Sequence, residues 1–344
     1  MRWFKRSAPD GGVAIAEAGD EFDGTSEELR AEIERLTAAA RAEPDPAAER
    51  QLLRLRHAAG TRLLDAARER PPQPAPTDLP GDGALPEIAP EQLTPGLLRA
   101  GILRDGCLLV RGLVAREDAL EFARLIDRVF AERERHDAGE SAADGYYEEF
   151  GPYPRFHPVA ERPWIKEGGG VLAADSPRLT FRMLELLAAA GVPALVAGYL
   201  GEPPLFTVQK TTLRRAEPAV PGAWHQDGAF MGDVRSLNLW LALSRCGDVA
   251  PGLDIVPRRL DGLVATQTDE AVLPYQVSQR RAEEAAGETP IVRPVFEPGD
   301  ALFFDGMLLH QTGSDPAMPR PRFGIESWFF GASGFPGTFT PMAI

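Results

Sequence analysis

Apolar residues change their spacing along the chain, from the period of an α-helix before residue 201 to that of a β-strand after it. Leu29, Ile33 and Leu36 fall on one helical face, and residues 25–28 before them have the spacing of a capping box. Further helices are predicted at about 46–70, 115–135 and 179–201. Strands are predicted at 106–112, 205–213, 236–243, 252–257, 291–296, 301–305 and 323–330.

The predicted strand at 236–243 has two different faces. Its four leucines point to one side, and Asn238 and Trp240 point to the other. Helices followed by many short strands with Pro and Gly turns predict a mainly β fold, a sandwich or jelly roll with flanking helices.

The pattern also divides the chain into two parts. Residues 1–80 are predicted to hold a mobile N-terminus to about residue 24, a helical hairpin and a stiff Pro-rich linker at 71–76. The main domain is predicted at 85–344. Within it, residues 140–175 have little periodicity and are expected to form a functional loop or lid. This loop contains Tyr146, Tyr147, Tyr153, Arg155, His157, Trp164 and Lys166.

Composition narrows the possible partners and the location. The formal net charge of −14 argues against nucleic acid and anionic membrane surfaces as partners. The two cysteines, Cys107 and Cys246, have no spacing typical of a thiolate metal site, and a reducing compartment suits them. No segment approaches the roughly 20 apolar residues of a membrane helix. We therefore expect a cytoplasmic protein.

Three residues have the chemistry of a non-haem iron site. His225 and Asp227 are two positions apart, so on an extended strand end both side chains point to one face. His310 ends a later apolar strand and supplies a third ligand, leaving positions open for a co-substrate and dioxygen. Other interpretations stay open, because His-x-Asp pairs occur by chance and a buried histidine can simply end a strand.

Arg322 is the candidate for binding a dicarboxylate co-substrate. Its guanidinium matches a carboxylate in a bidentate manner, which suits the far end of 2-oxoglutarate. Arg320 is the alternative, but it lies between two prolines, whereas Arg322 opens the last strand. Glu326 shares the strand face of Arg322 and is either the partner of a cation or part of the pocket wall.

These motifs occur in the order found in a known family. The segments 105–113, 224–227, 239–243, 251–257 and 298–304, followed by His310 and Arg322, resemble the phytanoyl-CoA dioxygenase family. The resemblance implies a double-stranded β-helix of the jelly-roll, cupin-like type. It also implies Fe(II), O2 and 2-oxoglutarate, which is decarboxylated to succinate and CO2, with ascorbate as a supporting reductant. Asp227 stands where related halogenases have a small residue, which favours hydroxylation. The sequence departs from the family after Pro257 and after His310.

Further site residues are expected around this centre. Candidates for co-substrate binding, besides Arg322, are Gln209, Asn238, Trp240 and Thr312. Strand alternation allows only one of Gln209 and Lys210 to face the interior, and Gln209 is preferred. Candidates for substrate contact are Lys210, Trp224, Phe230, Met231, Tyr153, His157 and Glu326.

The leading hypothesis is a 2-oxoglutarate-dependent dioxygenase that hydroxylates a small molecule, as a monomer or a homodimer. Two alternatives belong to other classes: a non-catalytic jelly-roll binding protein, and a cupin-type metalloenzyme that uses no 2-oxoglutarate. The presence of His225, Asp227 and His310 argues against a binding protein, which needs none of them. The presence of Arg322 argues against a metalloenzyme that uses no 2-oxoglutarate.

Overall fold

The computed structural model describes residues 22–67, 69–80, 85–140, 144–219, 222–232 and 234–344. The helices in these residues are α1 (Ser26–Ala42), α2 (Pro46–Ala66), α3 (Pro95–Asp105), α4 (Arg116–Asp137), α5 (Arg162–Glu167), α6 (Pro177–Ala189), α7 (Val192–Leu200), α8 (Gly228–Met231) and α9 (Gln279–Ala286). The strands are β1 (Glu87–Ile88), β2 (Cys107–Val110), β3 (Gly170–Leu172), β4 (Pro204–Thr207), β5 (Thr212–Ala216), β6 (Ser236–Ala242), β7 (Gly252–Ile255), β8 (Ala301–Phe304), β9 (His310–Gly313), β10 (Arg322–Gly331) and β11 (Pro341–Ala343).

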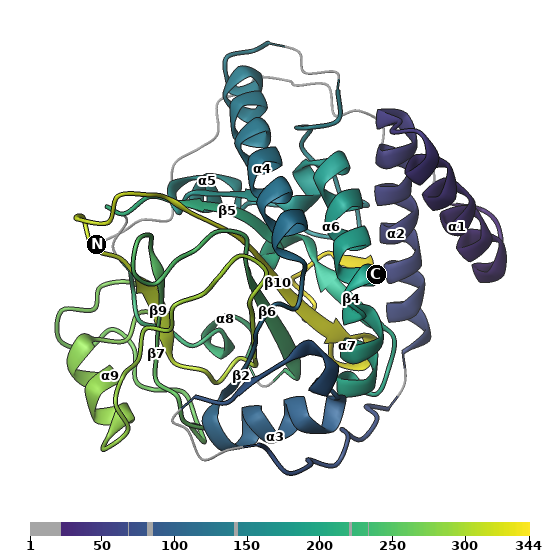
Figure 1. Ribbon diagram of the computed structural model, residues 1–344. Helices are drawn as coiled ribbons and strands as arrows, with labels where there is room; N and C mark the ends of the chain where they lie inside the picture. The colour runs from purple at the N-terminus through teal and green to yellow at the C-terminus, as the bar shows by residue number, and fades with distance from the viewer. Residues whose placement is uncertain (1–21, 68, 81–84, 141–143, 220–221, 233) are drawn as a thin grey trace.

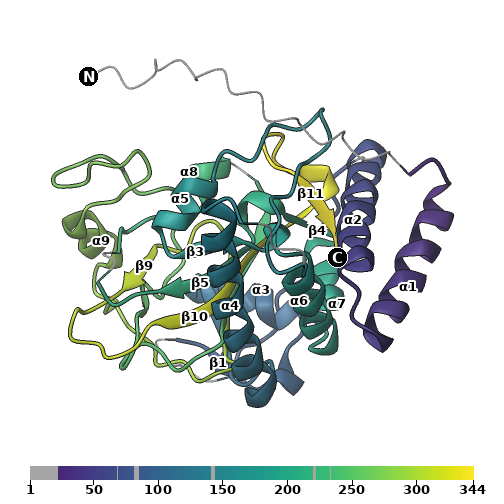
Figure 2. The same ribbon diagram turned by 90° about the horizontal axis from the view of Figure 1, so that it is seen from above.

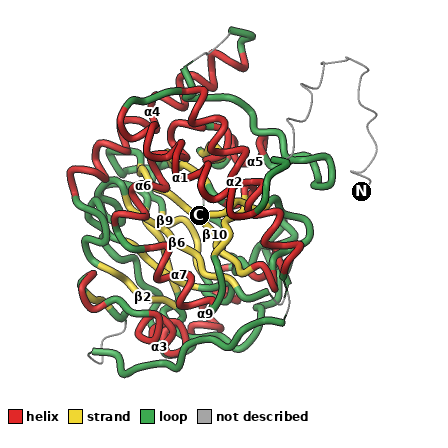
Figure 3. The backbone as a smooth tube through the Cα atoms, turned by 90° about the vertical axis from the view of Figure 1, so that its right-hand side faces the viewer, coloured by secondary structure: helices red, strands yellow, loops and turns green. Residues whose placement is uncertain are grey.

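Most of the strands belong to one large sheet. Its order is β1-β2-β8-β6-β10-β4-β11, and β5 pairs with β10 and carries β3. A smaller sheet pairs β7 with β9, and single bridges add the segments around His225 and Val292 to it. The strands lie in the interior, with helices around them (Figure 3).

The main hydrophobic core lies between one face of the large sheet and the helices α3, α4, α6 and α7 (Figure 1). The three leucines of β6 and Leu243, which follows it, enter this core, whereas Trp240 packs on the opposite side with residues of β7 and β8. The two faces predicted for β6 are therefore confirmed. The opposite side, toward the small sheet, holds the polar residues that matter for chemistry.

Helices α1 and α2 form an antiparallel pair at one end of the molecule, with the small sheet and α9 at the other end (Figure 1 and Figure 2). Thr25 forms the predicted capping box with Glu28 at the start of α1. Helix α2 packs against α6 and β11, so it shares the packing of the main domain. The mobile N-terminus was predicted for residues that lie almost wholly outside the described ones.

Several elements differ from the prediction. The architecture is mixed, because long helices hold more of the described residues than the short strands do. The helix predicted at 179–201 is two helices, α6 and α7, separated at Gly191, whose φ of 71° is left-handed. The strand predicted at 205–213 is interrupted by a 3₁₀ turn at residues 208–210. Residues 291–296 form only isolated bridges, at Val292 and Phe296.

Among the described residues no single helix is long and apolar enough to cross a membrane. Helices α6 and α7 pass that test of length and composition only when taken together, across a bend of 76°.

Candidate metal centre and active-site cavity

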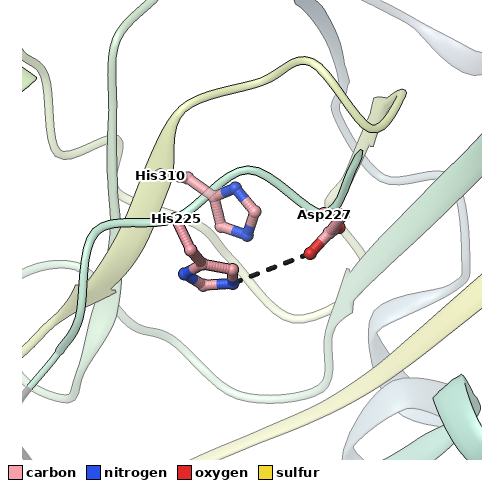
Figure 4. A group of neighbouring side chains, drawn as sticks. All are labelled: His225, Asp227 and His310. Carbon is pink, nitrogen blue, oxygen red and sulfur yellow. Dashed lines mark ion pairs between the residues drawn. The ribbon is translucent and has the colours of Figure 1, made fainter. Parts of the chain in front are cut away.

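Three side chains meet where the small sheet begins. His225 and His310 exchange backbone hydrogen bonds of 2.9 and 3.0 Å, so their rings lie side by side with centroids 4.4 Å apart. Asp227 follows at the start of α8, where the chain turns back toward both rings. One ligand atom from each of the three lies within 4.8 Å of the others (Figure 4). The predicted trio is therefore close enough together to hold one metal ion.

Hydrogen bonds fix the orientation of both imidazoles. Nδ1 of His225 lies 2.7 Å from the Ala223 carbonyl oxygen, and Nδ1 of His310 lies 3.1 Å from that of Leu308. A carbonyl only accepts, so both Nδ1 atoms carry the proton and both Nε2 atoms keep a lone pair. His225 Nε2 lies 3.6 Å from Oδ1 of Asp227. Two neutral imidazoles and a carboxylate form a donor set suited to Fe(II).

Burial changes the proton affinity of all three groups. It lowers the pKa of His225 to about 4, with the neighbouring His310 acting in the same direction, and it lowers the pKa of His310. It raises the pKa of Asp227 to about 6, although His225, Lys210 and Asn238 oppose that shift. The imidazoles are thus held neutral, as metal ligands must be, and a bound cation would favour the ionised carboxylate.

Asn238 on β6 holds the carboxylate from behind. Its Nδ2 donates to Oδ2 of Asp227 over 2.5 Å. The Oδ1 atom of Asn238 is buried and has no hydrogen-bond partner among the described residues. Asn238 therefore orients the carboxylate rather than lining the cavity itself.

The trio opens into a cavity of about 510 Å³ between the two sheets. Arg322, the first residue of β10, is buried in its wall, whereas Arg320 is exposed in the preceding loop. Arg322 donates from Nη1 to the Gly252 carbonyl over 3.1 Å, and its guanidinium lies 5.2 Å from the ring centroid of Trp240. Its Nε has no partner among the described residues. A buried donor without an acceptor fits a ligand that brings an oxygen.

Glu326 lies between two arginines on the same wall. Its Oε2 accepts from Arg214 Nε over 2.9 Å, and its Oε1 lies 3.5 Å from Arg322 Nη2. Burial would raise the pKa of Glu326, but Arg214 and Arg322 outweigh it and the pKa is lowered. Glu326 is thus an ionised partner of both cations, one of the two roles that the sequence left open.

Most of the other predicted residues also line the cavity: Gln209, Lys210, Phe230, Trp240 and Thr312. Gln209 and Lys210 both reach it, because the 3₁₀ turn breaks the alternation that would have separated them. The side chain of Gln209 is fully engaged, accepting from the Thr340 amide over 2.8 Å and donating to the Thr340 hydroxyl over 3.0 Å. Gln209 therefore ties the cavity wall to the C-terminal segment.

Four predicted substrate contacts lie elsewhere. Trp224 is buried in a separate cluster beneath α9, and Met231, the last residue of α8, packs against an aromatic cluster that includes Phe330 and Phe339. Tyr153 is buried against His57 of α2, with ring centroids 4.4 Å apart, and His157 is exposed to solvent. Tyr153 and His157 lie apart from the cavity because their part of the 140–175 loop packs against α2, where Tyr153 contacts His57 and Arg155 pairs with Asp65.

Two aromatic residues of the cavity, Trp328 and Tyr275, were not predicted as binding residues, whereas Trp164 belongs to the loop that was expected to be functional. Trp328 lies on the face of β10 shared with Arg322 and Glu326, so strand alternation would have found it. Tyr275 lines the cavity from a long irregular segment, and no periodic signal marks it. Trp164, from α5 in the predicted loop, completes this wall.

A family model described as phytanoyl-CoA dioxygenase (PhyH) matches residues 102–315, which is more than half of the chain. The chain belongs to the PhyH family. Membership of the PhyH family confirms the predicted class, an Fe(II)/2-oxoglutarate-dependent oxygenase and hence an oxidoreductase. The match begins near the end of α3 and ends shortly after β9, so it includes the three candidate ligands but not Arg322.

Solved structures show distant similarity to this PhyH-family chain. EctD from S. alaskensis, with 2-oxoglutarate and 5-hydroxyectoine, is 18% identical, with a TM-score of 0.49 and coverage of 71% of this chain and 79% of that one. AviO1 from Streptomyces viridochromogenes Tue57 is 20% identical, with a TM-score of 0.46 and coverage of 72% and 99%. The epimerase SnoN, with Fe3+, alpha ketoglutarate and nogalamycin RO, is 20% identical, with a TM-score of 0.44 and coverage of 68% and 82%. No protein with a curated description matches the sequence.

Proposed function

We propose that this PhyH-family protein hydroxylates a small molecule, with Fe(II) held by His225, Asp227 and His310. The observation that carries the proposal is the convergence of these three groups, within 4.8 Å, on the wall of the cavity. Their protonation fits the role, because both Nε2 atoms are unprotonated and the carboxylate is oriented by Asn238. Fe(II) with bound 2-oxoglutarate and dioxygen would supply the oxidising chemistry, releasing succinate and CO2.

Arg322 is proposed to bind the far carboxylate of 2-oxoglutarate. It is buried, and its Nε lacks a partner among the described residues. Trp240 and the Gly252 carbonyl hold the guanidinium in place, so little conformational freedom is lost when a ligand binds. Trp240 and Thr312 are proposed to complete this subsite, since both line the same cavity.

The protein's own task is to bind, orient and shield the reactants. A cavity of about 510 Å³ lies within the range of small-molecule sites and leaves room for a substrate beside the co-substrate. Its aromatic wall excludes water from the reacting atoms, which protects a strong oxidant from side reactions.

The arrangement around the site supports a finer assignment of the fold. The large and small sheets enclose the cavity, and we infer that they form the double-stranded β-helix predicted from the sequence. Helices α1 and α2 would then be an N-terminal extension of that domain. The boundary between residues 80 and 85 remains a prediction, as do the monomer or homodimer and the supporting role of ascorbate.

Binding and turnover of 2-oxoglutarate test the assignment against its alternatives. Anaerobic addition of Fe(II) and 2-oxoglutarate should produce a visible charge-transfer absorption, and admission of air should yield succinate. His225→Ala should abolish both, whereas His157→Ala, which changes an exposed histidine, should leave both intact. Metal binding without any 2-oxoglutarate binding would indicate a different cupin-type metalloenzyme. Lack of both would indicate a binding protein.

A further inference from the structure

Lys210 lies inside a cage of three aromatic rings on the cavity wall. Its Nζ is 4.1 Å from the ring centroid of Phe230, 4.8 Å from that of Trp328 and 5.0 Å from that of Trp164. The rings come from α8, β10 and α5, so the cage forms only in the folded cavity. Cation–π attraction holds the ammonium in one place, but aromatic faces cannot neutralise its charge.

Among the described residues, the ammonium of Lys210 has no direct partner, because it makes no hydrogen bond and no ion pair within 4.0 Å. Two nearby carboxylates are already engaged, because Asp227 accepts from Asn238 and Glu326 accepts from Arg214. A third, Glu161, acts on Lys210 only from beyond ion-pair distance. A half-buried charge without a counter-ion in contact is unfavourable unless a ligand supplies one.

The charges of the cavity lead to the same conclusion. Among the described residues that line the cavity, the buried or half-buried charged groups are three cations and two carboxylates: Lys210, Arg214, Arg322, Asp227 and Glu326. If the proposed function is correct, the Fe(II) dication and the 2-oxoglutarate dianion cancel each other, and one positive charge remains among these five lining groups. Glu167 also lines the cavity, but it is exposed to solvent, which screens its charge.

We propose that Lys210 binds a carboxylate of the substrate, so that the substrate is a small organic acid with an apolar part. This inference rests on the proposed function. A single excess positive charge matches a carboxylate better than a phosphate monoester, which carries a charge of about −1.5 to −2. Lysine is a point charge and lacks the bidentate geometry of arginine. Because aromatic rings surround it, its ammonium has room for one acceptor group.

The cage also indicates where the substrate is oxidised. Phe230 lies between Lys210 and the proposed metal ligands. Its ring centroid is 4.1 Å from Lys210 Nζ and 6.2 Å from the ring centroid of His225. A carboxylate on Lys210 is thus separated from the metal ligands by about the width of one ring. The oxidised carbon of the substrate therefore lies close to its carboxylate, and its apolar part packs against the rings of Trp164 and Tyr275, whose centroids are 6.4 Å apart.

Matched pairs of carboxylates and neutral amides test this inference. The probes are acetate and acetamide, benzoate and benzamide, and 3-phenylpropionate and 3-phenylpropionamide. Each is titrated calorimetrically into anaerobic protein saturated with Fe(II) and 2-oxoglutarate, so that Arg322 is already occupied. We expect at least one carboxylate to bind about tenfold more tightly than its amide. Lys210→Met should abolish that preference, and Lys210→Arg should retain part of it.

Lys166→Met is the matched control, because Lys166 is an exposed lysine paired with Asp137. It should keep the full preference. The inference is overturned if no carboxylate binds, if no pair differs, or if the preference survives in Lys210→Met. It is also overturned if Lys210→Met weakens only 2-oxoglutarate binding. Failure of the wild-type protein to bind 2-oxoglutarate would instead contradict the proposed function itself.

Discussion

Asn238 donates a hydrogen bond of 2.5 Å to one oxygen of Asp227, and the other oxygen of that carboxylate lies 3.6 Å from Nε2 of His225. The two oxygens of Asp227 thus have separate roles. One is anchored to the central strand β6, and the other is turned toward the histidines. Since the anchor removes rotational freedom from the carboxylate, the site is oriented before a metal arrives.

Asn238→Ala should weaken Fe(II) binding about tenfold to a hundredfold, the usual effect of removing a partner of a metal ligand. The variant keeps all three proposed ligands, so its loss should be recovered at high Fe(II) concentration. Titration of Fe(II) with anaerobic 2-oxoglutarate measures the affinity, and thermal unfolding of the metal-free protein provides the control. An unchanged Fe(II) affinity would show that the hydrogen bond has no positioning role.

Arg322→Ala should raise the KM for 2-oxoglutarate by about a hundredfold, because it removes one partner of a buried charge pair. The wild-type protein offers a nearby comparison in Arg320, which is exposed. Arg320→Ala should leave the KM within about twofold of the wild-type value. Steady-state succinate formation measures both variants. The reverse result would assign the co-substrate carboxylate to Arg320.

The regular strands made this site predictable from the sequence. Strand β6 is buried throughout and β10 is buried or half-buried. Alternation alone therefore placed Asn238, Arg322 and Glu326 on the side opposite the leucine core. The metal ligands His225, Asp227 and His310 could be predicted because two histidines and one carboxylate are the typical ligand set of non-haem iron. The family order of the motifs then linked strands that are far apart in the sequence.

Prediction failed where the chain leaves a regular period. The 3₁₀ turn at 208–210 brings both Gln209 and Lys210 to the cavity, whereas regular strand alternation would have allowed only one of them there. Tyr275 reaches the cavity from a segment whose path depends on tertiary packing. Tyr153 was expected there because it lies in an irregular, aromatic-rich loop, but a contact with His57 holds it at the other end of the molecule.

Gly299→Ala should destabilise the fold by about 2 kcal/mol or more, since the turn before β8 requires a left-handed residue. Gly299 has a φ of 98°, and an added Cβ would lie 2.1 Å from the Val114 carbonyl oxygen. Gly337→Ala is the control, because nothing lies within 4 Å of its Cβ position. Chemical unfolding measures both variants. Equal stability of the two would contradict the close approach between this turn and Val114.

His57 should make the protein less stable in mild acid. Its Nδ1 donates to the Pro341 carbonyl over 2.8 Å, and its Nε2 accepts from the Tyr153 amide over 3.2 Å. A proton on Nε2 would place an N–H donor of His57 against the N–H donor of Tyr153. Burial also lowers the pKa of His57 to about 4, from an ordinary value near 6.5. The unfolded chain therefore binds the proton first as the pH falls.

The free energy of unfolding should consequently decrease between pH 6.5 and 4, by about 3 kcal/mol for this group alone. Carboxylates add their own dependence, so the informative quantity is the difference between wild type and a variant. His57→Asn removes the titrating ring, and its unfolding free energy should fall less steeply over the same interval. Urea unfolding at several pH values measures both slopes. Parallel slopes would mean that His57 accepts a proton in the folded protein as readily as in the unfolded chain.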